Sequence, residues 1–207
     1  MKNLFDILVV LFLICLSLGL VDPTAEAKVD QHTIAVWLFE EGSGDRIKDT
    51  SGNAHHGKLS GKPKWIKTKF GHGLKLPGDA SGYVVVESNK KLKLKELTIE
   101  AFIQPTKPTG KWQGISCKQK AGCGNRNYGI WVHATNNKLH AQIGSGGAGD
   151  FSIDGESVIT DKKWHHVAFT YDDKIGRTYV DDKLETEKAH GKDPFFSDDP
   201  ITLVCQI

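Results

Sequence analysis

Three features are scarce in this 207-residue chain: helical periodicity, an excess of charge of one sign, and long apolar runs. Apolar residues hardly ever recur at the three- and four-residue spacing of an amphipathic helix, which argues against a helical fold. Lysine and arginine number 27 against 25 aspartates and glutamates, a formal net charge of +2. This charge is too small and too evenly spread to predict a nucleic-acid partner.

The one long uncharged stretch lies at the N-terminus, from Ile7 to Val21, and is mostly Leu, Val and Ile. It is short for a bilayer-spanning helix, which needs roughly 20 residues. Lys2 precedes it and Ala25-Glu26-Ala27 follows, the charged start and small-x-small end of a secretory signal peptide. We predict that residues 1–27 are a cleaved signal peptide and that the protein is secreted. The alternative is an uncleaved anchor, because Asp6 lies unusually close to the apolar stretch.

Residues 28–207 show no internal repeat and no composition shift that would divide them. Removal of residues 1–27 raises the net charge to +4, because that segment holds one lysine and three acids. The remaining length suits one all-β domain, with no membrane span after cleavage.

Three of the four cysteines remain after cleavage: Cys117, Cys123 and Cys205. In an oxidising compartment a disulfide is expected where geometry allows, and one of three thiols must stay odd. Cys117 and Cys123 flank a Gly-containing segment that can close a loop, so this pair is the predicted disulfide. The two other pairings stay open.

Short β-branched and aromatic runs, separated by Gly, Asn, Asp and Pro clusters, predict an all-β sandwich or barrel. The expected strands are 33–39, 82–87, 97–104, 113–118, 128–134, 138–144, 164–171, 177–180, 183–188 and 200–205. In the strand 164–171, Val167 and Phe169 share one face with His165, and His166 lies on the other. Asn-rich residues 135–137 and the pair Asp181-Asp182 predict the turns of two hairpins.

The order of the turn motifs is more specific than the strand pattern. In chain order the motifs are Trp37-Leu38-Phe39-Glu40-Glu41-Gly42-Ser43-Gly44, Asp49-Thr50-Ser51-Gly52-Asn53, Phe70-Gly71-His72-Gly73-Leu74 and Trp164-His165-His166-Val167-Ala168. This series resembles the laminin-G-like jelly-roll domain of the concanavalin-A-like lectin and glucanase superfamily. The resemblance covers nearly all of the mature chain, from about Ile34 to Leu203.

The resemblance implies an antiparallel two-sheet jelly-roll sandwich. It also implies that the final strand or strands are lacking, because relatives continue from the equivalent of residues 201–207 into a Gly turn and a further strand. We therefore expect residues 28–207 to be a C-terminally truncated laminin-G-like domain.

Catalysis is not predicted. Glucanase relatives carry closely spaced acids on one strand, and retaining hydrolysis needs two carboxyl groups about 5–5.5 Å apart. Here Glu100 is the one acid on the face that it occupies in the strand 97–104, and Asp172-Asp173 and Asp181-Asp182 are better explained as turns. The neighbouring pairs His55-His56 and His165-His166 have no third ligand at metal spacing, so they do not predict a zinc site.

Calcium is the one cofactor that the resemblance admits, since relatives often bind it in loops rich in Asp and Asn. The resemblance places Asp49, Asn53 and Asp79 in such loops. The favoured interpretation of the Asp49 loop is nevertheless a purely structural turn, in which Asp49 and Ser51 hydrogen-bond to the backbone before Gly52.

A polar and aromatic surface suited to sugars is expected from residues near two neighbouring strands. Its members are Trp112, Asn125, Arg126, Tyr128, Trp131 and His133. Trp131 alternates with Ile130 and Val132, and whether it faces the groove or the core stays open. The favoured function is a non-catalytic, lectin-like module that binds glycans or extracellular proteins. The alternatives are a structural or adhesion segment without its own ligand and a degraded glucanase relative.

Overall fold

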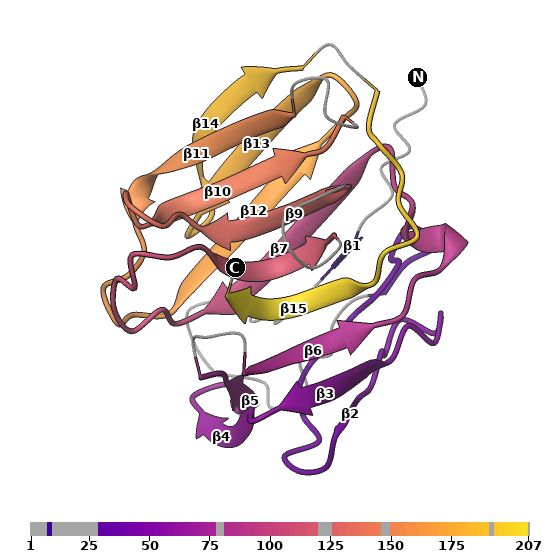
Figure 1. Ribbon diagram of the computed structural model, residues 1–207, viewed down its shortest axis with the longest axis vertical. Coiled ribbons are helices and arrows are strands. Elements are labelled where there is room, and N and C mark those ends of the chain that lie inside the picture. Colours follow the sequence, from indigo (N-terminus) through magenta and orange to yellow (C-terminus); the bar gives the residue numbers. More distant parts are fainter. Residues whose placement is uncertain are drawn as a thin grey trace, which may run out of the picture.

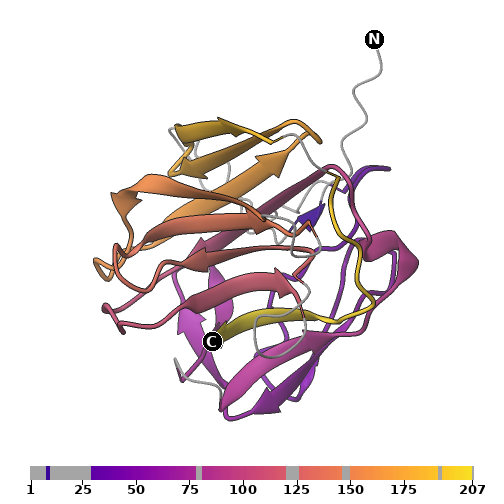
Figure 2. The ribbon, with the colours of Figure 1, turned by 45° about the horizontal axis from the view of Figure 1, so that its top comes forward.

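Two β-sheets pack face to face in a computed structural model of the protein (Figures 1 and 2). The structure describes residues 29–77, 81–119, 126–145, 150–190 and 193–206, together with a two-residue strand at 8–9. Within these ranges the one helical element is the 3-10 turn η1 (Lys90–Leu92). None of the described helices is long and apolar enough to span a bilayer.

The larger sheet has eight strands in the order β11-β10-β9-β8-β15-β6-β3-β2. The bounds are β2 (Arg46–Ile47), β3 (Gly57–Gly61), β6 (Gly82–Val86), β8 (Gln113–Lys118), β9 (Tyr128–Val132), β10 (Lys138–Ile143), β11 (Phe151–Val158) and β15 (Ile201–Gln206). All of its neighbouring strands are antiparallel. β15 lies in the middle of this sheet, where Thr202 pairs with Cys117 on one side and Val85 on the other (Figure 1).

The smaller sheet has the order β1-β7-β12-β13-β14. The bounds are β1 (Leu8–Val9), β7 (Leu97–Ile103), β12 (His165–Tyr171), β13 (Ile175–Val180) and β14 (Lys183–Ala189). β1 falls within the predicted signal peptide and pairs in parallel with β7, whereas the other pairs are antiparallel. A separate hairpin joins β4 (Lys64–Thr68) and β5 (Gly71–Lys75).

The core lies between the two sheets because side chains alternate along each strand. Ile130 of β9 and Ile99 and Phe169 of the smaller sheet are fully buried there, together with Trp37. The alternation predicted for β12 is confirmed, since Val167 and Phe169 belong to this core and His166 lies outside it. The predicted all-β two-sheet sandwich is therefore confirmed.

Most of the expected strands are present, but the strand predicted at 33–39 is wrong. Trp37 makes only an isolated bridge with Asp49, and Phe39 has a φ of +57° that no regular strand accommodates. The Val36 N–H donates to the side chain of Asp49, at 2.9 Å from Oδ1, and not to the backbone of a neighbouring strand.

Five strands of the described residues 29–206 were not expected: β2, β3, β4, β5 and β11. Glycines in β3, β5 and β11 dilute the apolar alternation that the prediction depends on. In β3 the packing requires a glycine at position 57, because a Cβ there would lie 2.6 Å from Val84 Cγ1.

Both predicted hairpin turns are confirmed. Asn137 closes the β9–β10 turn with a φ of +60°, and Asp181 and Asp182 between β13 and β14 have φ values of +50° and +64°. Positive φ at both central residues is the geometry that matches the twist of paired strands.

Candidate functional site

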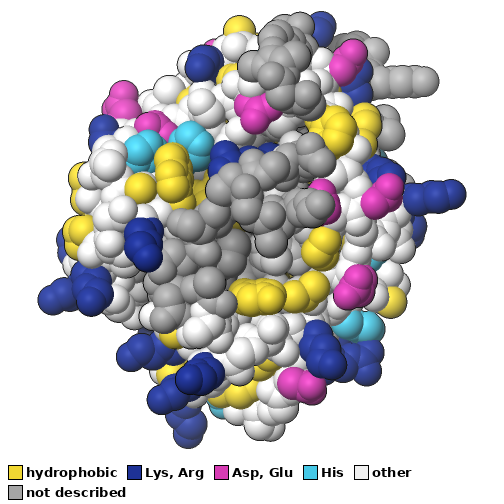
Figure 3. Space-filling view, in the orientation of Figure 1, with side chains coloured by type: hydrophobic (Ala, Val, Ile, Leu, Met, Phe, Trp, Pro, Cys, Tyr) yellow, Lys and Arg dark blue, Asp and Glu magenta, His cyan; other side chains and the backbone are white. Residues whose placement is uncertain are grey.

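An open cavity of about 500 Å³ lies on the outer face of the larger sheet, the face turned away from the core. Its lining includes Trp112, His133, His140, Gln142, Asp150 and Asp154, with Thr186 and Lys188 of β14 at its edge. Histidine and hydrophobic side chains gather on the upper left of this face, near β10 and β11 (Figure 3).

Strand register brings the cavity residues together. Trp131 of β9 pairs with His140 of β10, which pairs with Asp154 of β11, so the three side chains form a row across the sheet. Their sequence neighbours Ile130 and Leu139 point the other way, into the core. Two residues further along β10, Gln142 pairs with Ser152 of β11.

Trp131 forms the floor of this face. Its side chain lies over Gly129, where a Cβ would stand 2.6 Å from Trp131 Cη2. The Arg126 guanidinium carbon is 5.3 Å from the ring centroid, within range of a cation–π contact. Trp131 is only 1% exposed, and its Nε1 has no hydrogen-bond partner among the described residues. The tryptophan thus faces outward, but it is covered.

A chain of polar contacts links Arg126 to Asp150. Arg126 donates through Nη1 to Gln142 Oε1 and through Nε to Gln119 Oε1, the latter at 3.1 Å. Gln142 Nε2 then donates to Asp150 Oδ2 at 2.8 Å. The Gln142 amide is therefore fixed in one orientation, which preorganises this side of the cavity.

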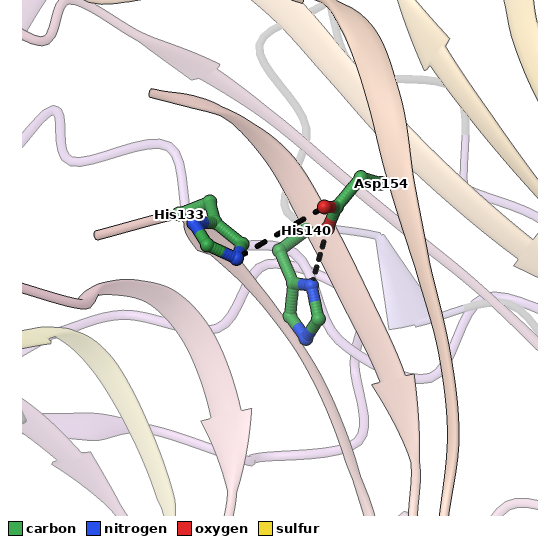
Figure 4. Close-up of side chains that lie close together, drawn as sticks. All are labelled: His133, His140 and Asp154. Atoms are coloured by element: carbon green, nitrogen blue, oxygen red, sulfur yellow. Dashed lines mark hydrogen bonds and ion pairs between the residues drawn. The ribbon is translucent and has the colours of Figure 1, made fainter. Parts of the chain in front are cut away.

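Trp112 packs against two histidines to form a wall of the cavity. Its ring centroid lies 4.2 Å from that of His133 and 4.7 Å from that of His140. Both histidines point towards Asp154 (Figure 4). His140 Nδ1 is 2.6 Å from Asp154 Oδ1, and His133 Nε2 is 4.0 Å from Asp154 Oδ2.

The cluster combines a neutral imidazole with an ionised carboxylate. Burial lowers the pKa of His140, and this effect outweighs the hydrogen bond to Asp154 that would raise it. Burial alone would raise the pKa of Asp154, but the hydrogen bond from His140 and the contact with Asn136 outweigh it and lower the pKa. At neutral pH these groups offer lone pairs and a negative charge to a ligand.

Four of the predicted sugar-binding residues lie at this site: Trp112, Arg126, Trp131 and His133. Tyr128 does not, which corrects the prediction: it is fully buried in the core and its hydroxyl donates to the Leu92 carbonyl at 2.9 Å. That burial strongly raises the pKa of Tyr128. Asn125 lies outside the described residues.

Of the residues that line the cavity, sequence reasoning found only Trp112 and His133, and it missed His140, Gln142, Asp150 and Asp154 among others. The alternation of strand 138–144 already placed His140 and Gln142 on the same face. Asp154 could not be placed, because β11 was not recognised as a strand.

Asp49 and Asn53, two of the residues implied for calcium, accept hydrogen bonds from other groups of the protein. Asp49 accepts from Val36 N–H and Ser51 N–H through Oδ1 and from His55 N–H through Oδ2, at 2.8–2.9 Å. The predicted Asx-type turn is thus confirmed. Asn53 Oδ1 accepts from the Lys91 ammonium at 2.7 Å, so a lysine already supplies the positive charge beside this oxygen. Calcium binding at these loops stays a prediction, and Asp79 lies outside the described residues.

Cys117 is buried in β8, and its thiol lies 3.7 Å from the Ile130 carbonyl. Cys123 lies outside the described residues, so the disulfide between them stays a prediction.

Comparison with known proteins places the fold. Residues 78–205 match the Laminin_G_3 family, described as concanavalin A-like lectin/glucanases superfamily. No curated protein matches the chain significantly.

Similar solved structures include domains of a mosquitocidal protein, of a botulinum neurotoxin and of an extracellular arabinanase. The binding domain of Paraclostridial Mosquitocidal Protein 1 aligns at a TM-score of 0.66 and 15% identity, over 84% of this chain and 44% of that one. A structure of botulinum neurotoxin type C, whose cell entry depends on interaction with two ganglioside molecules, aligns at a TM-score of 0.66 and 18% identity, over 84% of this chain and 43% of that one. Domain 4 of the Geobacillus stearothermophilus arabinanase AbnA, in complex with arabinotriose, aligns at a TM-score of 0.55 and 16% identity, over 75% of this chain and 76% of that one. The chain thus matches less than half the length of either the mosquitocidal or the neurotoxin structure, and at these identities the likeness concerns the fold.

Proposed function

Since the chain belongs to the concanavalin A-like lectin/glucanases superfamily, we propose that it is a secreted, non-catalytic module that binds glycans in the cavity over β9, β10 and β11. The observation that carries this proposal is the cavity itself, in which an aromatic wall stands beside fixed amide and carboxylate groups. Two structures that share the fold support a glycan as the ligand, since the botulinum neurotoxin type C enters cells through an interaction with two ganglioside molecules and the AbnA domain is in complex with arabinotriose.

The chemistry of the lining suits a sugar. A sugar ring presents an apolar C–H face, which stacks on an aromatic ring, and hydroxyl groups that both donate and accept hydrogen bonds. Trp112 supplies the aromatic surface, and Asp150 and Lys188 of the lining supply an acceptor and a donor. Polar groups that are already oriented lower the entropy cost of binding.

The carboxylates of the cavity argue against hydrolysis. A glycosidase needs a protonated carboxyl group with a raised pKa as its general acid. Asp154 has a lowered pKa, because the hydrogen bonds from His140 and Asn136 stabilise its charged form. Asp150 accepts from Gln142 and from the Ser145 N–H, so both of its oxygens are held by protein donors.

A glycan array tests the proposal, with protein collected from the culture medium, whose N-terminus is expected to be Lys28. Trp112→Ala should weaken binding about tenfold, the effect of losing a buried aromatic anchor worth over 1 kcal/mol. Trp65→Ala is the matched control, because Trp65 is also half-buried but lies on β4, outside the cavity. Both variants are checked for folding by thermal unfolding.

Two results would count against glycan binding. One is a folded wild-type protein that binds no glycan on the array, which would favour a structural or adhesion segment instead. The other is a Trp112→Ala variant that binds as well as the wild type.

A further inference from the structure

Two histidines and one aspartate of the cavity converge from three chain segments in the way that ligands of a metal ion do. His133 follows β9, His140 lies in β10 and Asp154 in β11, and one donor atom from each lies within 4.8 Å of the others. We propose that His133, His140 and Asp154 bind a Zn²⁺ ion, with its fourth position open to the cavity. The cavity supplies that opening, because all three residues line it.

The separations fit a small tetrahedral ion. Zinc bonds of about 2.0–2.1 Å place tetrahedral ligand atoms about 3.3 Å apart. The separation of 2.6 Å between His140 Nδ1 and Asp154 Oδ1 is shorter than this, and one donor atom of each residue lies within 4.8 Å of the other two. Changes of less than about 1 Å in the short separation and of no more than about 1.5 Å in the wider ones therefore bring the three donors to zinc distance. An ion bound between His140 Nδ1 and Asp154 Oδ1 replaces their hydrogen bond, and the ring proton of His140 then lies on Nε2.

Outer contacts hold the donors in place, as in established metal sites. Asn136 accepts from the Lys138 N–H through Oδ1 at 3.0 Å, which directs its Nδ2 to Asp154 Oδ2 at 2.9 Å. Asp154 Oδ1 is thereby left for the metal. His133 Nδ1 accepts from the Thr135 N–H at 3.2 Å, a contact that orients the ring with Nε2 towards Asp154. When an ion binds Nε2, the ring proton moves to Nδ1, and the Thr135 hydroxyl at 3.3 Å becomes its acceptor in place of that N–H contact.

The packing limits how the ligands can move. Trp112 contacts both imidazole rings, and the side chains of His133 and His140 are 21% and 11% exposed. Holding the rings beforehand reduces the entropy lost on metal binding.

The donor set selects the type of ion. Imidazole nitrogens suit zinc and its transition-metal neighbours, whereas Ca²⁺ requires six to eight oxygens. Three protein ligands with an open fourth position are the arrangement that leaves room for water or for an oxygen of a ligand. The zinc proposal stands independently of the glycan proposal, because it needs no sugar and is tested with the metal alone.

The test is a titration of the full chain, without a histidine tag and treated with chelator, with Zn²⁺ by calorimetry and with Co²⁺ by visible absorption. We expect one ion per chain, a tetrahedral Co²⁺ spectrum that Zn²⁺ abolishes, and no comparable heat with Ca²⁺. His140→Gln and Asp154→Asn should each weaken Zn²⁺ binding at least about tenfold. Asn136→Ala, which leaves all three ligands in place, should weaken it by a smaller factor.

His72→Gln is the matched control, since His72 also lies beside a carboxylate, with Nδ1 3.8 Å from Glu40 Oε2, but outside the cavity. Its Zn²⁺ affinity should equal that of the wild type. Folding of each variant is checked by far-ultraviolet circular dichroism. The proposal is overturned by a folded wild type that binds no Zn²⁺, by unchanged affinity in Asp154→Asn and Asn136→Ala, or by a thiolate-to-cobalt band that assigns the ion to cysteine.

Discussion

Two histidine clusters lie at different places in this sandwich, and their surroundings give them opposite properties. The cavity cluster, on the outer face of the larger sheet, is His133, His140 and Asp154. The edge cluster, where β12 begins and β13 turns into β14, is His165 and His166 with Glu100, Asp161, Asp181 and Asp182. In the cavity cluster two imidazoles share one carboxylate, whereas in the edge cluster each imidazole has two.

The ratio of carboxylates to imidazoles decides the charge of the rings. Burial lowers the pKa of His140, and a single aspartate does not compensate. Burial would also lower the pKa of His165, but hydrogen bonds to Asp161 and Asp181 outweigh it and raise the pKa. The hydrogen bond to Glu100 raises the pKa of His166 against the effect of burial. The cavity cluster therefore offers the lone pair of a neutral His140 to a cation, whereas the carboxylates of the edge cluster favour protonated His165 and His166, which have no lone pair to offer.

The largest expected effect concerns the floor beneath the cavity cluster. Trp131→Ala should lower the free energy of unfolding by about 3–5 kcal/mol, because it removes a fully buried indole and leaves a void. Trp112→Ala, at the rim, should cost clearly less, since Trp112 is only partly buried. Urea unfolding of the two variants measures the difference. Equal losses would show that Trp131 is not the structural floor.

The next effect is the pH dependence of stability, which should have opposite signs in the two clusters. A raised folded-state pKa gives His165 and His166 a stabilising contribution that is complete below their unfolded pKa of about 6.5 and is lost as the pH rises through the folded pKa. The lowered pKa of His140 acts the other way, so its contribution falls as the pH drops below about 6.5. Nuclear magnetic resonance titration of chelator-treated protein should place the pKa of His140 below and those of His165 and His166 above that value. A His166 pKa at or below that of His140 would contradict the predicted difference in histidine pKa between the two clusters.

The smallest effect is expected from Glu100→Gln. Loss of the carboxylate 3.4 Å from His166 Nε2 should lower the pKa of His166 towards its ordinary value. The free energy of unfolding should change by no more than about 1 kcal/mol, as for other ion pairs near the surface. Glycan binding should be unchanged because Glu100 lies in the other sheet. A loss of glycan binding in this variant would move the site to the smaller sheet.

Local patterns in the sequence account for much of the fold. Strand β12 was predictable because its buried and outward residues alternate without a glycine, and the Asp181-Asp182 turn because aspartate tolerates positive φ. The Asx turn at Asp49 was predictable because an aspartate side chain accepts hydrogen bonds from backbone N–H groups two residues on. Strand β11 was not, because Asp154, Gly155 and Glu156 interrupt its apolar alternation, and its place depends on pairing with β10.

The sequence by itself determined the all-β class, the two hairpins and the face on which each residue of a regular strand lies, because these follow from a period of two residues and from turn chemistry. Only the tertiary structure decided which faces meet. Alternation puts Tyr128 and Trp131 on opposite faces of one strand, but only the packing decided that the Tyr128 face turns to the core and the Trp131 face to the cavity. Asp154 reaches His140 only through the register of two paired strands, and register depends on the packing of the whole sheet.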